Sequence, residues 1–295
     1  YINHTSYLLD DTIVHVVHYF KAPGYYLFPI DVKSMFLAAK KRVLKLLKEE
    51  GEFDAVHGHG LITACTVSQI GNIFGAPSFL TIHGREDPTK VENSRFKRKS
   101  LQMYLKAVTN VVLVGMPLVP YYSRVSVGKQ NYQVIPNGID PTMHCSLSRV
   151  DLNRKKGDDV VILSVAGLHQ TKGLEYNLRV LARLLNKNMQ GVCLWIVGDG
   201  PDKKRLQRIV DELGIQEQVV FWGEVPNQEI CEFMRVADIF SLPSYLEAFG
   251  IVYLEAMLHS KPVIGCAGEG CEDIVEDGVD GFLIPPHDIN ALMEK

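Results

Sequence analysis

Short apolar runs alternate with helical patterns along the chain, and this alternation constrains the fold more than any other feature. In the second half the runs are uninterrupted, as in Val160–Val165 and Val192–Val197, and each precedes a segment with apolar residues at helical spacing. A strand that is apolar at every position is buried on both faces, which is typical of parallel sheets covered by helices. The pattern therefore predicts an α/β fold built on parallel sheets.

The expected strands and helices fall into two groups. In the first group, strands are predicted at Thr12–Tyr19, Asp54–His57, Phe79–Ile82, Asn110–Val114 and Gln133–Ile135, with a helix at Ser34–Glu50. In the second group, strands are predicted at Val160–Val165, Val192–Val197, Val219–Trp222, Ile239–Leu242 and Pro262–Gly265, with helices at Leu174–Asn186, Lys203–Leu213, Gln228–Val236 and Gly250–His259. The stretch between the groups is polar, charged and without periodicity. We thus expect two Rossmann-like domains, residues 1–145 and 159–295, joined by a linker at 146–158.

Size and charge narrow the range of functions. A chain of 295 residues is long enough for about two domains. Its net charge of -3 gives no electrostatic reason to expect nucleic acid as a partner. No apolar stretch approaches the roughly 18 residues of a membrane-spanning helix, and no signal peptide is visible, so we expect a cytoplasmic location. The chain starts at Tyr1 and stops within a helical pattern at Asn290–Lys295, and we expect it to be truncated at both ends.

Two glutamates follow the predicted strand Ile239–Leu242 and are separated by seven residues. Glu247 lies in the loop after the strand, and Glu255 lies within the next predicted helix. Gly250 between them lets backbone approach a ligand closely, and the helix start offers free N–H groups and a positive dipole end to a diphosphate. A carboxylate on the helix can accept hydrogen bonds from a ribose diol. The alternative is that Ser244-x-x-Glu247 is a capping box and Glu255 a surface residue.

Lys172 is a second candidate for anion binding. It follows a predicted strand and opens a predicted helix, so that a cation and a helix N-terminus converge on one site. The alternative is an exposed lysine in the connection between a strand and a helix.

A series of segments resembles, in the same order, the retaining glycosyltransferases of family 4, which have the GT-B fold and an E-x7-E motif. The segments are Val134–Asp140, Leu163–Gly173, Val197–Pro201, Val220–Val225, Ala237–Asp238, Ser244–Met257, Lys261–Ile264, Asp277–Gly278 and Gly281–Pro285. The resemblance is specific over nearly all of 160–295 and looser over 50–140. It implies two Rossmann-like domains that face each other across a cleft. It also implies retaining, metal-independent transfer of a hexosyl group from a nucleoside diphosphate sugar to an acceptor hydroxyl, with no cofactor.

The resemblance implies a role for each matching donor-site residue. Glu255 would bind the nucleotide ribose, and Glu247 would contact the donor sugar near the reacting centre. Lys172 would neutralise the diphosphate leaving group, and the backbone around Val225 would face the base. Backbone amides would hold sugar hydroxyls and the diphosphate at Phe249, Gly250, Ile251 and Val252. The acceptor would be a sugar or a lipid-linked molecule, in surface polysaccharide or glycolipid synthesis.

Histidines follow two predicted strands of the first half. Thr81–Gly84 resembles the family's T-x-H-G segment, whose histidine faces the donor sugar, so His83 would line the cleft. His57 and His59 point the same way on an extended chain, and with His83, Glu86 or Asp87 they could instead form a zinc site. The third interpretation is that His57 and His59 are satisfied polar residues at a strand end.

The sequence departs from the family pattern at one position of the phosphate loop. The family usually has an arginine five residues before the lysine, as a second clamp on the diphosphate, and here that position is Gly167. Either His169 or Gln170 compensates, or the diphosphate is held more weakly.

Two further features leave alternatives open. The basic run Arg95–Leu105 could contact an anionic membrane surface near a lipid-linked acceptor, or it could be a solvated charged face. The motifs are also compatible with a non-catalytic nucleotide-sugar-binding protein or with another GT-B-type enzyme, such as a sugar-nucleotide epimerase or a phosphorylase. A dinucleotide oxidoreductase is disfavoured, because Gly198-Asp-Gly200 followed by Pro201 is only part of the required glycine fingerprint.

Overall fold

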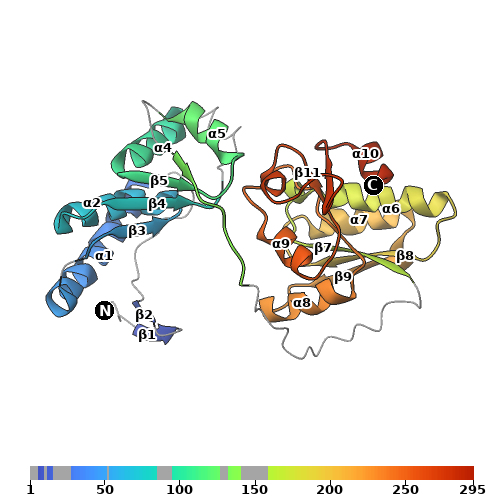
Figure 1. The fold of residues 1–295 in the computed structure, drawn as a ribbon, viewed down its shortest axis with the longest axis horizontal. Coiled ribbons are helices and arrows are strands. Elements are labelled where there is room, and N and C mark those ends of the chain that lie inside the picture. Colours follow the sequence, from blue (N-terminus) through green and yellow to red (C-terminus); the bar gives the residue numbers. More distant parts are fainter. Residues whose placement is uncertain are drawn as a thin grey trace. The chain divides into compact units, whose positions relative to one another are not determined.

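A computed structural model of the chain describes residues 6–9, 12–15, 28–51, 53–84, 95–126, 132–140 and 159–295. The chain forms two compact units, Tyr1–Pro136 and Asn137–Lys295. Each unit has its own parallel sheet with helices packed against it (Figure 1). The predicted linker 146–158 lies outside the described residues, and the predicted border at 145 stays a prediction.

The parallel sheet of the first unit has the strand order β3-β4-β5-β6. The strands are β3 (Val56–His59), β4 (Ser78–Ile82), β5 (Asn110–Leu113) and β6 (Tyr132–Val134). His59 at the end of β3 pairs in register with Thr81 of β4. The carboxyl ends of these two strands therefore bring the predicted histidines to the same edge of the sheet.

The helices of the first unit are α1 (Phe28–Glu50), α2 (Ala64–Phe74), α4 (Arg95–Ala107) and α5 (Leu118–Val125), with a short 3-10 turn at Leu61–Thr63. The helix α1 begins before the predicted start at Ser34 and includes Pro29, which is tolerated in a first turn because no intrahelical N–H is needed there. No helix was predicted at α2 or α5.

The predicted strand Thr12–Tyr19 is confirmed at Thr12–His15, while residues 16–19 lie outside the described residues. Its pairing differs from the parallel sheets expected for the chain. The strand β2 (Thr12–His15) pairs antiparallel with β1 (Ser6–Leu9) in a separate two-stranded sheet. Only two residues of sequence separate these strands, which suits a hairpin, whereas a parallel pair needs a crossover of about a dozen residues.

The second unit has a six-stranded parallel sheet in the order β12-β11-β10-β7-β8-β9. The strands are β7 (Val160–Val165), β8 (Val192–Val197), β9 (Val219–Gly223), β10 (Ile239–Ser241), β11 (Val263–Cys266) and β12 (Gly281–Ile284). The chain builds outward from β7 through β8 to β9, then returns to the other side of β7 with β10. In open parallel sheets, ligands bind at the carboxyl ends of strands where the order reverses. That point lies between β7 and β10.

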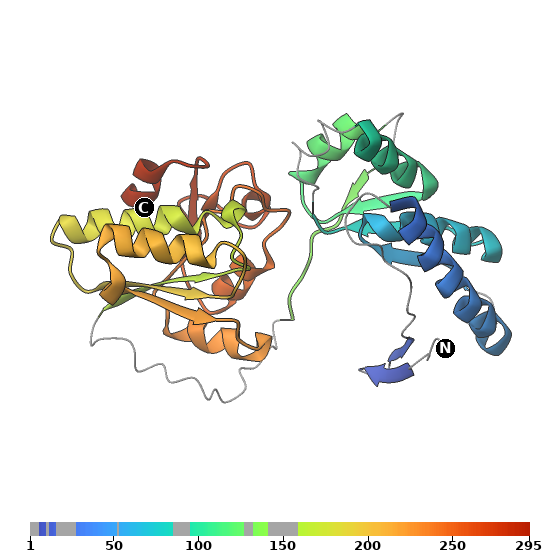
Figure 2. The same ribbon diagram turned by 180° about the vertical axis from the view of Figure 1, so that it is seen from behind.

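Helices cover both faces of this sheet. The helices are α6 (Leu174–Asn186), α7 (Lys203–Leu213), α8 (Asn227–Val236), α9 (Ile251–Leu258) and α10 (Ile289–Glu294). On one face α6 packs against both α7 and α10, and α8 contacts α9 on the other (Figure 2). Right-handed crossovers explain this division, because the strand order reverses at β7. Within the described residues, no helix is long and apolar enough to span a membrane.

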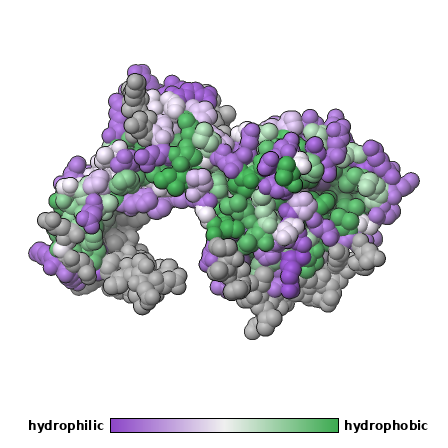
Figure 3. Space-filling view, viewed as in Figure 1, coloured by the Kyte–Doolittle hydropathy of each residue, from purple (hydrophilic) through white to green (hydrophobic). Residues whose placement is uncertain are grey.

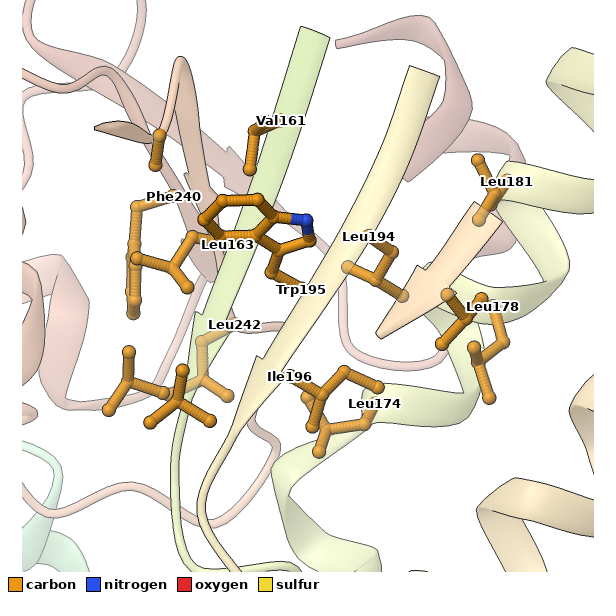
Figure 4. Close-up of a cluster of buried hydrophobic side chains, with 14 of the residues drawn as sticks. Val161, Leu163, Leu174, Leu178, Leu181, Leu194, Trp195, Ile196, Phe240 and Leu242 are labelled. Atoms are coloured by element: carbon orange, nitrogen blue, oxygen red, sulfur yellow. The ribbon is translucent and has the colours of Figure 1, made fainter. Parts of the chain in front are cut away.

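The core of the second unit is centred on Trp195 of β8. The side chain is fully buried and lies among aliphatic and aromatic residues of neighbouring strands, including Val161, Leu163 and Phe240 (Figure 4). Its ring also meets Trp222 edge-on, with ring centroids 5.1 Å apart. A densely packed interior holds its side chains in single rotamers and resists compression. The strand ends that carry the candidate site thus rest on a closely packed core.

Candidate functional site

The loops at the carboxyl ends of β7 and β10 bring together two predicted site residues. Lys172 Nζ donates a hydrogen bond to Glu247 Oε2 over 2.7 Å. The side chains are 23% and 13% exposed, so water screens this ion pair less than an ordinary surface pair. The sequence predicted each residue separately. The structure adds that they form one charge pair at the point where the strand order reverses.

The loop that carries Glu247 is tied to the loop that carries Lys172. The Tyr245 N–H donates to the Thr171 carbonyl over 3.0 Å, and Ser244 Oγ donates to the same carbonyl over 3.2 Å. The capping-box interpretation of Ser244 is therefore wrong. The helix α9 begins later, at Ile251, with Gly250 as its N-cap and no side-chain capping bond.

Gly250 forms the turn into α9 in a conformation that other residues avoid. Its φ is +88°, and a Cβ at this position would lie 2.5 Å from the ring of Tyr253. Phe249 before it is buried, whereas Ile251 after it is 40% exposed. Figure 3 shows hydrophobic surface on the second unit over α9. The first turn of α9 is thus accessible, and its free N–H groups can receive an anion.

Glu255 lies farther along α9 and is half-buried. Burial raises the pKa of its carboxyl group, and the nearby charge of His259 lowers it by less. The His259 ring nitrogen Nδ1 lies 2.8 Å from the Glu255 carbonyl oxygen. A carboxylate in this partly desolvated setting forms stronger hydrogen bonds to a ligand hydroxyl than one in water.

Val225 lies in the connection between β9 and α8, partly buried against the core of the unit. This connection also follows the carboxyl end of a strand. It belongs to the same edge of the sheet as the Lys172 loop and the loop after β10.

The space beside Gly167 is occupied by an imidazole ring. A Cβ built on Gly167 would lie 3.6 Å from Cδ2 and 4.0 Å from Nε2 of His169, with no other heavy atom outside its chain neighbours within 4 Å. Of the two residues considered as a replacement for an arginine at 167, His169 is therefore the one whose ring lies within van der Waals contact of that position. Its nitrogen atoms can serve as donors towards an anion.

Three histidines of the first unit form a chain of contacts. His59 Nδ1 lies 2.8 Å from His83 Nε2, and His57 Nε2 lies 2.7 Å from Thr81 Oγ1. The rings of His57 and His59 are 4.6 Å apart at their centroids, and those of His59 and His83 are stacked at 5.1 Å. Burial, and then the charge of neighbouring histidines, lowers the pKa of both His57 and His83. His83 is thus favoured in its neutral form.

The predicted zinc alternative involves His57 and His59 together with His83, Glu86 or Asp87. Among the residues that the structure describes, no group of three or more histidine, cysteine, aspartate or glutamate side chains is arranged to hold a metal ion. Glu86 and Asp87 lie outside the described residues. His57 instead has a hydrogen-bond partner at the strand end, in agreement with the third interpretation for this residue.

Comparison with known proteins decides the family. Residues 4–143 match the family described as Glycosyltransferase Family 4, and residues 150–295 match the family described as Glycosyl transferases group 1. The chain belongs to glycosyltransferase family 4. The two matches follow each other along nearly the whole sequence, as the motifs predicted.

Among curated relatives, this family 4 chain is 29% identical to the D-inositol 3-phosphate glycosyltransferase of Stackebrandtia nassauensis, over 92% of the chain and 66% of the relative. It is 26% identical to an uncharacterized glycosyltransferase of Methanocaldococcus jannaschii, over 88% of the chain and 69% of the relative. It is 33% identical to the GDP-mannose-dependent α-(1-6)-phosphatidylinositol monomannoside mannosyltransferase of Mycolicibacterium smegmatis. This match covers 46% of the chain and 37% of the relative. The chain thus spans about two thirds of the relatives that it matches over most of its length.

Solved structures confirm the predicted GT-B fold of the family 4 chain. The complex of Anabaena HepE with UDP superposes with a TM-score of 0.71 at 22% identity, covering 88% of this chain and 72% of HepE. Sucrose-phosphate synthase from Thermosynechococcus elongatus gives a TM-score of 0.76 at 23% identity, covering 93% of this chain and 69% of the synthase.

One acidic residue beside the candidate site was not predicted from the sequence. Glu269 follows β11, is 7% exposed, and its Oε2 accepts a hydrogen bond from the Glu247 N–H over 2.8 Å. The signal available in the sequence was an acidic residue in the loop that follows a predicted strand, four residues after its end at Gly265. Nothing in the sequence linked it to Glu247, which lies 22 residues earlier.

Proposed function

We propose that the protein transfers a hexosyl group from a nucleoside diphosphate sugar to an acceptor hydroxyl, with retention of anomeric configuration and without a metal ion. The observation that carries the proposal is the Lys172–Glu247 ion pair at the reversal point of the sheet. A cation and an anion held 2.7 Å apart suit a donor that presents a diphosphate next to a hydroxyl-rich sugar.

In this proposal the second unit binds the donor. The diphosphate lies at the start of α9, where backbone N–H groups of Ile251 and Val252 and the ammonium of Lys172 neutralise the leaving group. Glu247 accepts hydrogen bonds from the donor sugar, and Glu255 accepts them from the ribose diol. The backbone around Val225 faces the base. The positive charge on Lys172 and the α9 dipole replace the metal ion that other transferases use.

His83 of the first unit contributes a hydrogen bond to a donor-sugar hydroxyl. Its lowered pKa supports a neutral ring at neutral pH, which can accept or donate a hydrogen bond. His59, hydrogen-bonded to the His83 Nε2 atom, leaves Nδ1 of His83 for the sugar.

The names of the relatives support the substrate class. HepE has been solved with UDP and with UDP-glucose, whereas the mycolicibacterial relative is named for GDP-mannose. Relatives named for inositol phosphate and phosphatidylinositol mannoside acceptors support a sugar or lipid-linked acceptor, in glycolipid or surface polysaccharide synthesis.

A product assay in excess chelator tests the proposal. The purified protein is incubated with UDP-, GDP- and ADP-hexoses and candidate acceptors, and the anomeric configuration of the product is read by NMR. We expect an α-linked product from an α-linked donor, at an unchanged rate in EDTA. An inverted product, or full dependence on Mg²⁺ or Mn²⁺, would contradict it. An epimerised donor without transfer, use of free phosphate, or binding without turnover would point to the alternative functions.

His169 is proposed to take the place of the arginine that is missing at 167. We expect His169→Ala to weaken nucleoside diphosphate binding by about threefold to tenfold, since one hydrogen bond from an exposed side chain is lost. Gly167→Arg in the His169→Ala background should restore the affinity, because the space around position 167 admits a side chain. Calorimetric titration measures both, with the free nucleoside as a control whose affinity should not change. Equal nucleoside diphosphate affinity in wild type and His169→Ala would assign no role to His169.

A cytoplasmic enzyme with a lipid-linked acceptor would benefit from contact with the membrane surface. On α4, Arg95, Arg98 and Lys99 are exposed together with Met103, which is 49% exposed. Basic and apolar side chains on one helix favour anionic lipid surfaces. We expect the protein to float with vesicles that contain anionic lipid and not with neutral ones, and Arg98→Glu/Lys99→Glu to abolish flotation. Absence of flotation with anionic vesicles would assign α4 to a solvated face.

A further inference from the structure

Glu269 is a buried acidic residue that the proposed function does not yet use. It lies between β11 and a 3-10 turn at Gly270–Asp273, in an extended conformation with φ -115° and ψ 172°. The residue is 7% exposed. Burial of a carboxylate is unfavourable unless hydrogen bonds compensate for the lost water. The buried Glu269 carboxylate should therefore have a hydrogen-bond partner.

The loop of Glu269 binds the backbone of Glu247 on both sides. Glu269 Oε2 accepts from the Glu247 N–H over 2.8 Å, and the Gly270 N–H donates to the Glu247 carbonyl over 3.1 Å. Two adjacent residues thus satisfy both backbone polar groups of Glu247. The bond to the carboxylate is charge-assisted and therefore stronger than a bond between neutral groups.

Gly270 shows how closely the two loops approach. A Cβ at Gly270 would lie 2.3 Å from the Phe249 backbone nitrogen and 2.5 Å from the Ala248 carbonyl carbon. Real Cβ atoms essentially never come so close to backbone, so only glycine fits. The close approach is what brings the Glu269 carboxylate within reach of the Glu247 N–H.

The segment around Glu247 needs such a support. Residues 243–250 lie between β10 and α9 and form neither helix nor strand, so no regular backbone hydrogen-bond pattern fixes their conformation. One end of the segment is tied to the Thr171 carbonyl through Ser244 and Tyr245. The contact with Glu269 and Gly270 fixes it again at Glu247 itself. A functional side chain must be held within about 0.5 Å of its working position.

We propose that Glu269 is a positioning residue whose buried carboxylate holds the Glu247 backbone so that the Glu247 side chain meets Lys172 and the donor sugar. This inference rests on the proposed function. It assigns to Glu269 an effect that passes through Glu247, and not a contact with the substrate.

A double-mutant cycle tests the inference through the rate of donor consumption. The variants are Glu269→Ala, Glu269→Gln, Glu247→Gln and the double variant Glu247→Gln/Glu269→Ala. We expect Glu269→Ala to lower kcat by about tenfold to 100-fold, since a partly buried N–H loses a charged acceptor. Glu269→Gln should stay within about threefold of wild type, because an amide oxygen can still accept from the Glu247 N–H. In the Glu247→Gln background, Glu269→Ala should cause no further loss, because both changes act on one side chain.

Nucleoside diphosphate affinity separates positioning from loss of structure. Lys172, Glu255 and the start of α9 are unchanged in Glu269→Ala, so we expect its dissociation constant for the diphosphate that wild type binds to change less than threefold. Wild-type kcat in Glu269→Ala, or additive losses in the double variant, would overturn the inference. So would a loss of nucleotide affinity as large as the loss of kcat. A wild-type protein that consumes no donor would instead refute the proposed function, and the inference with it.

Discussion

Replacement of Lys172 with alanine is expected to lower the rate of glycosyl transfer by about 10²- to 10³-fold. Removal of one preorganised donor from a site where negative charge develops has an effect of this size in other enzymes. Here the Lys172 side chain is 23% exposed and already paired with Glu247, so the variant also leaves the Glu247 side chain, which is 13% exposed, without its cation. Initial rates at saturating donor measure the effect.

Lys261→Ala is the matched control for this variant. Lys261 precedes β11, at the amino end of the strands, and its Nζ donates to the Arg235 carbonyl over 3.0 Å. Loss of a lysine there should leave kcat within about twofold, since the edge of the sheet that binds ligands is the opposite one. If Lys172→Ala behaved like Lys261→Ala, the leaving-group role of Lys172 would be wrong.

The second large effect is expected on nucleotide affinity. Glu255→Ala should raise the dissociation constant of the nucleoside diphosphate by about tenfold to 100-fold, because hydrogen bonds from the ribose to a charged acceptor are lost. The wild-type affinity should also fall on acidification. Burial raises the pKa of Glu255, so the loss should begin above the ordinary glutamate value of about 4.3. Titrations from pH 8 to pH 5 measure this dependence, and Glu255→Gln should show a flatter one.

Removal of the Glu255 charge should affect stability in the opposite direction to affinity. A carboxyl group whose pKa is raised in the folded state binds its proton more tightly there than in the unfolded chain. Its contribution to stability is therefore favourable at low pH and is lost as the pH rises through the folded pKa. At pH 7.5 the buried charge is a cost, and Glu255→Gln should have a Tm equal to or above that of wild type. A variant with lower affinity and a lower Tm would indicate damage to the fold instead of loss of a ribose contact.

The second unit could be predicted closely from the sequence. The bounds of β7, α6, β8 and α7 agree with the predicted ones. Strands buried on both faces are apolar throughout. The helices between them end at residues that favour a helix C-terminus, such as Gly214, which adopts φ +68° at the end of α7. Here local pattern and tertiary environment point to the same structure.

The first unit was less predictable for local reasons. Pro120 reads as a helix breaker, yet it lies in the first turn of α5, where a missing N–H costs nothing. The buried face of α2 includes Ala64, Thr66 and Gly71, which are too small or too polar to give a clear helical period.

Pairings within the candidate site depend on strand order, which a single sequence does not specify. Lys172 and Glu247 are 75 residues apart and meet because β10 returns to the side of β7. Ser244 has the local pattern of a cap, but its hydroxyl donates to Thr171, 73 residues away. Motifs could predict the candidate site residues, whereas the hydrogen-bond partner of each residue depends on the order of the strands in the sheet.

Calorimetric titration of the chain with UDP, GDP and ADP tests the central claim most directly, because it asks whether the second unit holds a nucleoside diphosphate. We predict saturable binding of one of the three with a stoichiometry near one, and its loss in Glu255→Ala. A folded sample, shown by a cooperative thermal transition, that binds none of the three nucleotides would contradict the account.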